Sequence, residues 1–264
     1  MEDAHAVVDG FGGDKGTGFF GVYDGHGGRA IAEFLRTNLH DTVEKELHAK
    51  GSKSVEECLK SAFLLTGTYF RHLATAALSQ PLRTWGHAHW FADIAANETK
   101  EQASGATAVV CIVRQSGASR YVYAANCGDA RAVLCHNGAA VRLTRDHKAD
   151  DPEEVNRIEA AGGFILRKRV MGVLAVARSF GDFTLKQYVT AEPFTTTTKL
   201  DGTSEFLIIA CDGVWDVLED QAAVDIVRQC AATDSKRKLA GKALVRASLA
   251  SGSTDNVTAM VVWL

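Results

Sequence analysis

The stretch that decides the fold is Val22-Tyr23-Asp24-Gly25-His26-Gly27-Gly28. It follows an apolar run that predicts the end of a strand, and its glycines predict a tight turn that lets a ligand approach the backbone. Apolar residues then recur at helical spacing, which predicts a helix over 27–46. A carboxylate and an imidazole therefore lie between two rigid elements, where a scaffold presents reactive groups to solvent. Because Asp and Gly are also ordinary turn residues, this stretch alone leaves a purely structural turn equally open.

Carboxylates recur at similar positions elsewhere in the chain. Asp129, Asp212 and Asp255 each stand near a small residue where a strand is predicted to end or begin, and Glu2 and Asp3 lie at the start. Hard divalent cations such as Mg²⁺ and Mn²⁺ take oxygen ligands. This placement therefore predicts that carboxylates from distant segments converge on a divalent cation.

The residues around these carboxylates resemble the metal-dependent protein phosphatases of the 2C type, which dephosphorylate phosphoserine and phosphothreonine. The resemblance is specific, because sequence blocks of this family occur in the family's order over essentially the whole chain. The blocks are Met1–Asp3, Val22–Gly28, Ser104–Ala108, Asn126–Leu134, Leu143–Lys148, Arg169–Asp182, Ala210–Leu218 and Ser253–Thr258.

The resemblance implies a metal centre with two Mg²⁺ or Mn²⁺ ions. In this centre Asp24 bridges the two ions, and Asp129 with Asp212 holds a looser third ion. A water molecule shared by two cations loses a proton easily, and the resulting hydroxide attacks phosphorus in line. The coordination shells of the two ions are completed, directly or through water, by Glu2, the Gly25 carbonyl, Asp212 and Asp255.

The resemblance also suggests roles for residues around the metals. His26 matches the family's general acid, which protonates the departing serine or threonine oxygen, and the alternative is a turn histidine bonded to backbone. Asp3 is expected to position metal-bound water or to support the ligands from behind. Asp216 either touches the third ion or caps the turn after Asp212. Arg169 either meets the substrate phosphate or is a solvated surface charge.

The chain departs from the family pattern in two places. The family has a phosphate-binding arginine a few residues before Met-Glu-Asp and a first strand upstream, so we expect a single catalytic domain over 1–264 that lacks its N-terminal strand. The segment from about 66 to 102 is longer than usual and is expected to be an insertion, whose aromatic residues such as Trp85 and Trp90 form a packing or partner-binding patch. His87 and His89 have no Cys or carboxylate partner nearby, so loop histidines are favoured over a metal site.

Two other functions stay open. The absent upstream arginine is consistent with a catalytically impaired protein that has the phosphatase fold and only binds its partners, although the retained carboxylates favour catalysis. A two-metal nuclease uses similar carboxylates but requires a basic groove for the phosphate backbone. Metal-dependent turnover of phosphoprotein rather than DNA separates these functions.

Composition limits the partners. The 264 residues, 46% of them hydrophobic, are enough for one large domain with a sizeable core. The formal net charge of −3 argues against nucleic acid as the main partner. The sequence contains no apolar stretch of about 18 residues and no secretory signal at its start. We therefore expect a monomeric cytoplasmic or nuclear enzyme that acts on phosphorylated proteins and has no membrane span.

The order of the predicted elements indicates an α+β fold. Strands and helices come in groups rather than in strict βαβ alternation, which favours antiparallel sheets covered by helices. One helix is predicted to begin after Asp151, with Pro152 in its first turn and Glu154 closing a capping box. The family resemblance implies a four-layer α-β-β-α sandwich of two central antiparallel sheets flanked by helices, with the metals at one end between the sheets.

Overall fold

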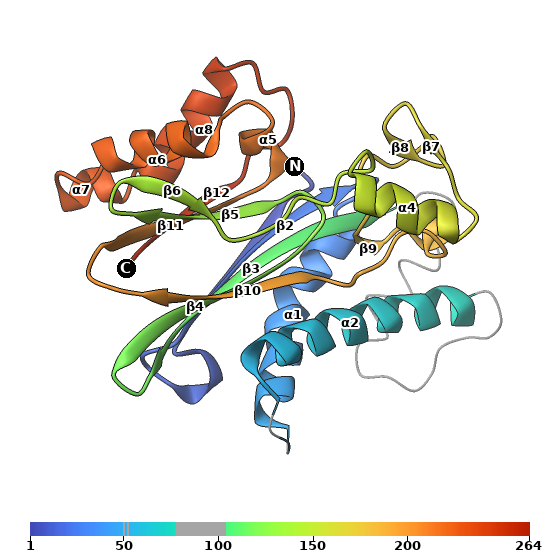
Figure 1. The fold of residues 1–264 in the computed structure, drawn as a ribbon, viewed down its shortest axis with the longest axis horizontal. Helices are drawn as coiled ribbons and strands as arrows, with labels where there is room; N and C mark the ends of the chain where they lie inside the picture. The colour runs from blue at the N-terminus through green and yellow to red at the C-terminus, as the bar shows by residue number, and fades with distance from the viewer. Residues whose placement is uncertain (50, 52, 78–103) are drawn as a thin grey trace.

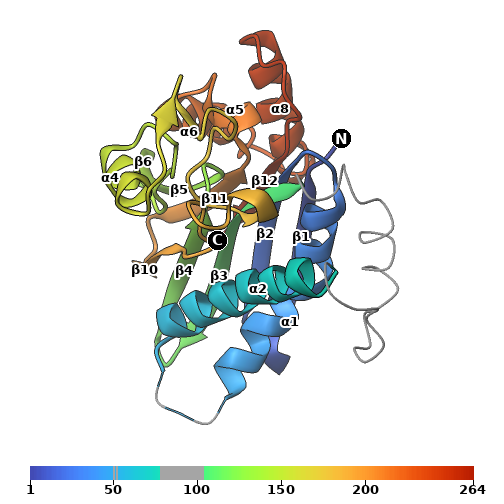
Figure 2. The same cartoon turned by 90° about the vertical axis from the view of Figure 1, so that its right-hand side faces the viewer.

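Two antiparallel β-sheets face each other, and helices cover the outer face of each sheet (Figure 1). The computed structural model describes residues 1–49, 51, 53–77 and 104–264. The view in Figure 2 shows the same stacking from the side. The predicted residues Trp85, Trp90, His87 and His89 lie outside the described residues, so the predictions made for them stay predictions.

The first sheet has the strand order β1-β2-β3-β4-β10, and β9 pairs with the start of β3. Nine successive residues of β3, from Gly105 to Val113, are buried, because this strand has helices on one side and the second sheet on the other. A continuous apolar run is typical of a strand covered on both faces. The strands are β1 (Ala4–Asp9), β2 (Gly18–His26), β3 (Gly105–Ser116), β4 (Ser119–Cys127), β9 (Phe180–Gly181) and β10 (Phe194–Leu200).

The second sheet has the strand order β12-β11-β5-β6. Among the described strands, β12 pairs only with β11, so its other edge is unpaired. The strands are β5 (Arg131–His136), β6 (Ala139–Arg142), β11 (Ser204–Ala210) and β12 (Ala259–Trp263).

The helices form the two outer layers. The helices α1 (Ala30–His48) and α2 (Val55–Ala77) pack on the first sheet, where Leu35, Phe63 and Ile112 belong to one apolar cluster. The second sheet is covered by helices from the last third of the chain, and Ile208 and Val224 belong to the cluster between them. These helices are α5 (Asp212–Trp215), α6 (Asp220–Gln229), α7 (Asp234–Arg237) and α8 (Ala240–Ala250).

A third apolar cluster fills the space between the two sheets. It joins Val109 and Cys111 of β3 to Leu134 of β5 and to Leu207 and Ile209 of β11. Alternate residues of β11 therefore contribute to different clusters, because side chains along a strand point alternately to opposite faces. The predicted four-layer α-β-β-α sandwich is confirmed.

A smaller unit lies at one end of the sandwich (Figure 1). It contains α4 (Pro152–Ala160) and the hairpin of β7 (Ile165–Leu166) and β8 (Arg169–Val170), and Ile158 and Val170 share its small apolar core. Single 3-10 turns occur at η1 (Phe11–Gly13) and η3 (Phe183–Leu185).

The predicted start of α4 is confirmed, but the predicted capping box is wrong in one half. The Asp151 side chain accepts hydrogen bonds from the backbone N–H groups of Glu153 (2.9 Å) and Glu154 (3.4 Å). The Glu154 carboxylate does not return to the cap, because it is buried and binds the guanidinium groups of Arg157 and Arg178. Two cations compensate this buried charge better than one backbone N–H group does.

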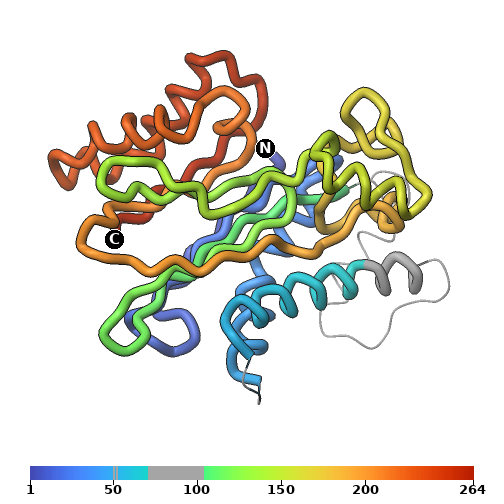
Figure 3. Tube along the Cα trace, viewed as in Figure 1, coloured from blue at the N-terminus to red at the C-terminus, as the bar shows by residue number. Residues whose placement is uncertain are grey.

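No helix among the described residues is both long and apolar enough to cross a membrane. Figure 3 shows the N-terminus beside the C-terminal part of the chain. The backbone N–H of Glu2 donates to Asn256 Oδ1 at 2.8 Å, which fixes the start of the chain against the turn before β12.

Candidate metal centre

Both sheets place a carboxylate at the same end of the sandwich. Asp24 lies near the end of β2, and Asp212 begins α5 directly after β11. One side-chain ligand atom from each of Asp24, Cys211 and Asp212 lies within 4.8 Å of the other two. The structure thus brings together two of the predicted metal ligands, although 188 positions separate them in the sequence (212 minus 24).

The two carboxyl groups hold protons more tightly than ordinary aspartates. Burial, followed by the charges of Asp212, Asp3 and Asp129, raises the pKa of Asp24 to about 10. Burial, followed by the charges of Asp129 and Asp216, raises the pKa of Asp212 to about 7. Clustered carboxyl groups with raised pKa values are typical of functional sites, because a cation that would stabilise their charged forms is part of the function.

The start of the chain contributes two of the predicted residues. A Cβ atom on Gly25 would lie 2.4 Å from the backbone oxygen of Glu2, so only glycine allows these two backbones to approach each other. Asp3 Oδ2 accepts a hydrogen bond from Thr258 Oγ1 at 2.7 Å. Asp3 Oδ1 is buried and accepts no hydrogen bond from any described residue.

Asp129 is buried and lies on the other side of the cluster. Its Oδ2 atom is 3.4 Å from Nζ of Lys148, and its buried Oδ1 atom has no hydrogen-bond partner among the described residues. The same ammonium group lies 2.7 Å from Asp216 Oδ1. Asp216 is also the C-terminal cap residue of α5, where its backbone N–H donates to the Asp212 carbonyl at 2.8 Å. Its side chain pairs with Lys148, and its contact with a third ion stays a prediction.

Asp255 lies on an exposed turn, where its Oδ1 atom accepts a hydrogen bond from the backbone N–H of Asn256 at 2.7 Å. Its charge contributes to the raised pKa of Asp212 after burial, Asp129 and Asp216. Asp255 is therefore at the solvent side of the cluster, whereas Asp129 is at its buried side.

Cys211 is close to the carboxylates but is unsuited to a hard cation. Burial raises the pKa of its thiol, and the charges of Asp3 and Asp24 raise it further, so the thiol stays protonated. Its sulfur accepts a hydrogen bond from the backbone N–H of Thr258 at 3.1 Å and donates to the backbone oxygen of Asn256 at 3.4 Å. Like the other cysteines, it is a free thiol.

The donor set fits a hard divalent cation. It consists of carboxylate oxygens, two of which, Asp3 Oδ1 and Asp129 Oδ1, are buried without a described partner. The Lys148 ammonium between Asp129 and Asp216 shows that this position attracts a positive charge. Oxygen-rich sites of this kind favour Mg²⁺ or Mn²⁺ over softer metals.

His26 forms a hydrogen bond with a residue that the sequence did not suggest as a site residue. Its Nε2 atom lies 2.9 Å from both carboxylate oxygens of Asp182. The predicted alternative, a turn histidine bonded to backbone, does not match this side-chain partner.

Arg169 is held within its own hairpin. It is exposed on β8, and its Nη1 atom donates to the backbone oxygen of Val173 at 2.7 Å. None of the hydrogen bonds or ion pairs of the described residues links it to the carboxylate cluster.

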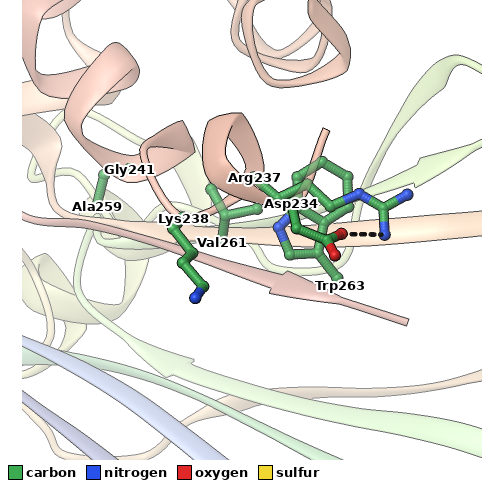
Figure 4. A pocket seen from close by; sticks show the side chains of 7 residues that line it. All are labelled: Asp234, Arg237, Lys238, Gly241, Ala259, Val261 and Trp263. Carbon is green, nitrogen blue, oxygen red and sulfur yellow. Dashed lines mark ion pairs between the residues drawn. The ribbon is translucent and has the colours of Figure 1, made fainter. Parts of the chain in front are cut away.

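Figure 4 shows a pocket on the outside of the second sheet, with a volume of about 490 Å³. It opens beside the unpaired edge of β12, where the Arg237 guanidinium lies 5.0 Å from the centre of the Trp263 ring. The pocket contains none of the clustered carboxylates. Its lining residues are Asp234, Arg237, Lys238, Gly241, Ala259, Val261 and Trp263.

The sequence analysis missed Lys148 and Asp182 as site residues. Both lie inside sequence blocks that resemble the family, and Asp182 follows a glycine as Asp129 does. That Gly-Asp pattern is the signal that identifies Asp182. Nothing in the local pattern distinguishes Lys148 from a surface lysine, because its partners lie 19 and 68 positions away (148 minus 129, and 216 minus 148).

Comparisons with known proteins agree with this fold. The protein phosphatase 2C family matches residues 1–257. The chain is 36% identical over 277 residues to protein phosphatase 2C homolog 1 of Saccharomyces cerevisiae, which covers 100% of this chain and 88% of the relative.

Two solved structures share the fold. A C. elegans sex determining protein matches with a TM-score of 0.80 and 23% identity, over 99% of this chain and 61% of that chain. A phosphatase from a pathogenic strain of Toxoplasma gondii matches with a TM-score of 0.75 and 22% identity, over 99% and 87%.

The fold, its acidic cluster and these matches together define an enzyme class, the metal-dependent phosphatases. The chain belongs to the protein phosphatase 2C family. It is a protein serine/threonine phosphatase, and its family depends on Mg²⁺ or Mn²⁺.

Proposed function

We propose that this chain hydrolyses phosphoserine and phosphothreonine on proteins with two divalent cations and a looser third one. The observation that carries the proposal is the half-buried, charge-crowded pair Asp24 and Asp212, whose ligand atoms lie within 4.8 Å of each other. Desolvation first, and neighbouring carboxylates next, raise the pKa values of both. In this proposal Asp24 would help to hold both Mg²⁺ or Mn²⁺ ions, and Asp129 with Asp212 would hold the third. The remaining ligands are Glu2, the Gly25 carbonyl and Asp255.

The protein's own residues supply charge, position and a proton. When bound, the divalent ions supply the positive charge that activates a water molecule and offsets the charge of the phosphate. Asp3 is held by Thr258 through Oδ2, its buried Oδ1 has no described partner, and in this proposal Oδ1 orients water at the cluster. The His26 side chain is 30% exposed, so a substrate can reach it, and it protonates the oxygen that leaves phosphorus.

We propose that Arg169, on the hairpin of β7 and β8, contacts the phosphorylated protein substrate. Its exposed position allows this contact, and its hydrogen bond to Val173 keeps the guanidinium in the hairpin. The substrates are phosphorylated proteins, and we propose that the enzyme acts as a monomer over one catalytic domain.

The experiment is phosphate release from a phosphothreonine peptide with Mn²⁺, with Mg²⁺ and with EDTA. Activity that requires metal and falls at least about 1,000-fold in Asp24→Asn supports the proposal. Asp225→Asn is the matched control, because Asp225 is an exposed aspartate that accepts a hydrogen bond from Gln221 on α6. A duplex DNA substrate in the same assay tests the nuclease alternative.

If no phosphate is released in this assay, the result supports the alternative of a catalytically impaired binding protein. The same assay is then repeated on the chain extended at its N-terminus by a segment that contains an arginine. If the extended protein releases phosphate, the proposal stands. If the extended protein is folded and still releases no phosphate, the proposal is overturned.

A further inference from the structure

Asp182 is a buried carboxylate that the proposed chemistry has not used. Its side chain is 5% exposed, whereas the side chain of His26 is 30% exposed. The two residues are 156 positions apart, and both Asp182 oxygens lie 2.9 Å from His26 Nε2. An imidazole N–H donates in this arrangement and a carboxylate accepts, so Nε2 carries the hydrogen.

The carboxylate is held from its other side. The Ser179 hydroxyl donates a hydrogen bond to Asp182 Oδ2, and the backbone N–H of Asp182 donates to the Ser104 carbonyl at 2.9 Å. Lys186, whose Nζ atom donates to the Ser179 carbonyl at 2.8 Å, adds a favourable charge interaction with Asp182. These contacts hold Asp182 in place independently of its hydrogen bond to the imidazole.

The backbone is shaped around this pair. Asp182 adopts a left-handed conformation with φ of 49°, which is uncommon for a residue other than glycine. Its side chain precedes η3 but makes no capping hydrogen bond there. A Cβ atom at Gly105 would lie 2.2 Å from Asp182 Oδ2 and 2.3 Å from His26 Nε2, so glycine leaves the space in which the two side chains meet.

We propose that Asp182 is a positioning residue that holds the His26 ring by Nε2 and leaves Nδ1 as the atom that delivers the proton. This inference rests on the proposed role of His26 as the general acid. His26 Nδ1 makes no hydrogen bond to any residue that the structure describes, so it is available to a substrate. In the step, His26 acts in its imidazolium form, which carries a hydrogen on each ring nitrogen. The phosphorus–oxygen bond to the serine or threonine breaks, its electron pair goes to that oxygen, and the Nδ1 proton is transferred there, which leaves the neutral ring with its hydrogen on Nε2.

The kinetic test compares leaving groups. A serine or threonine alkoxide needs a proton as it departs, whereas p-nitrophenolate is stable enough to leave without one. We expect Asp182→Asn to lower kcat for a phosphothreonine peptide about 10- to 100-fold and to change kcat for p-nitrophenyl phosphate less than about threefold. Asp201→Asn is the matched control, because Asp201 also pairs with a histidine, His136, but on the exposed surface (3.8 Å).

The variant His26→Ala separates this inference from the proposed function. If His26→Ala lowers peptide turnover selectively and Asp182→Asn adds nothing in that background, the two residues act as one unit. If His26→Ala is selective but Asp182→Asn is not, the positioning role is wrong. If His26→Ala affects both substrates equally, His26 is not the acid, and the positioning role fails with the proposed function.

A second measurement needs no variant and no turnover. Nitrogen-15 NMR of the wild-type protein with Mg²⁺, at a pH where His26 is neutral, reports which ring nitrogen carries the hydrogen. We expect the Nε2–H form, because Asp182 accepts that hydrogen. A dominant Nδ1–H form would overturn the inference.

Discussion

The Nζ atom of Lys148 lies 3.4 Å from a carboxylate oxygen of buried Asp129 and 2.7 Å from Asp216. The protein's own cation thus occupies the place where Asp129 is expected to help bind a third metal ion. Burial alone would lower the pKa of Lys148, but Asp129 and Asp216 raise it, so the ammonium stays charged. We therefore expect lysine and a divalent ion to compete for the same carboxylates.

We expect Lys148→Met to strengthen the weakest Mn²⁺ site about tenfold, because two unit charges near a protein surface interact by a few kcal/mol before solvent screening. Calorimetric titration with Mn²⁺ measures the affinity of each site. Lys168→Met is the control, because Lys168 pairs with Asp150 on the exposed surface. Unchanged or weaker binding in Lys148→Met would contradict the competition.

Metal-free Asp24→Asn is expected to be more stable than the wild type at pH 8, by about 2 kcal/mol, although it loses metal binding. Burial and neighbouring carboxylates raise the pKa of Asp24 to about 10, so the folded protein binds a proton there that the unfolded chain releases near pH 4. Stability from this group is complete below pH 4 and declines as the pH rises toward 10. Denaturant unfolding in EDTA measures the difference.

The comparison is made between pH 7 and pH 9, where the wild type should lose more stability with rising pH than Asp24→Asn does. Added Mg²⁺ should raise the stability of the wild type and leave Asp24→Asn unchanged. If the metal-free wild type instead gains stability relative to Asp24→Asn from pH 7 to pH 9, Asp24 does not hold a proton in the folded protein.

Arg131→Met is expected to lower the free energy of unfolding by about 3 kcal/mol, because it leaves half-buried Asp146 without its guanidinium partner and removes one of the two arginines that bind Asp220. The Arg131 side chain is 8% exposed and binds Asp146 and Asp220, and its guanidinium lies 5.0 Å from the centre of the Trp215 ring. Chemical denaturation measures the loss. Arg142→Met, which removes an exposed partner of the same Asp220, should cost less than about 1 kcal/mol; equal losses would show that burial is irrelevant.

His147 should make the protein sensitive to acid. Burial, with a smaller contribution from Arg178, lowers its pKa to about 4, so the folded protein keeps it neutral while the unfolded chain takes up a proton near pH 6.5. Stability from this group is present above pH 6.5 and is lost as the pH falls toward 4. In EDTA, His147→Gln should lose about 2 kcal/mol less than the wild type between pH 6.5 and 4.5. The control His136→Gln, at an exposed histidine, should lose as much stability as the wild type over this pH range. If His147→Gln also loses as much stability as the wild type, this expectation is wrong.

Much of this architecture is predictable from local pattern. The helix predicted over 27–46 is present as α1, Ala30–His48. Apolar spacing over 236–249 is typical of one continuous helix, but the structure has two helices there, α7 and α8, because this spacing does not reveal the break at Lys238 and Leu239. Boundaries depend on packing that a short window of sequence does not contain.

The site residues likewise divide into those that the sequence predicts and those that it does not. Asp24, Asp129 and Asp212 were predicted from their places at strand ends and from the family resemblance, and charge interactions link them in the structure. Lys148 and Asp182 were missed, because each acquires its role from a partner on another element. Contacts of this range are set by the packing of the two sheets, which no local pattern encodes.

The hydrogen bond between Glu2 and Asn256 joins segments 254 positions apart. Protein synthesis proceeds from the first residue, so a growing chain already displays Asp24 and His26 long before Asn256 and Asp255 are made. Until those residues leave the ribosome, the turn that holds Glu2 and completes the cluster does not exist. With the proposed set of ligands, the nascent protein has no complete centre for phosphate hydrolysis, and we expect its activity to begin only when this late segment docks.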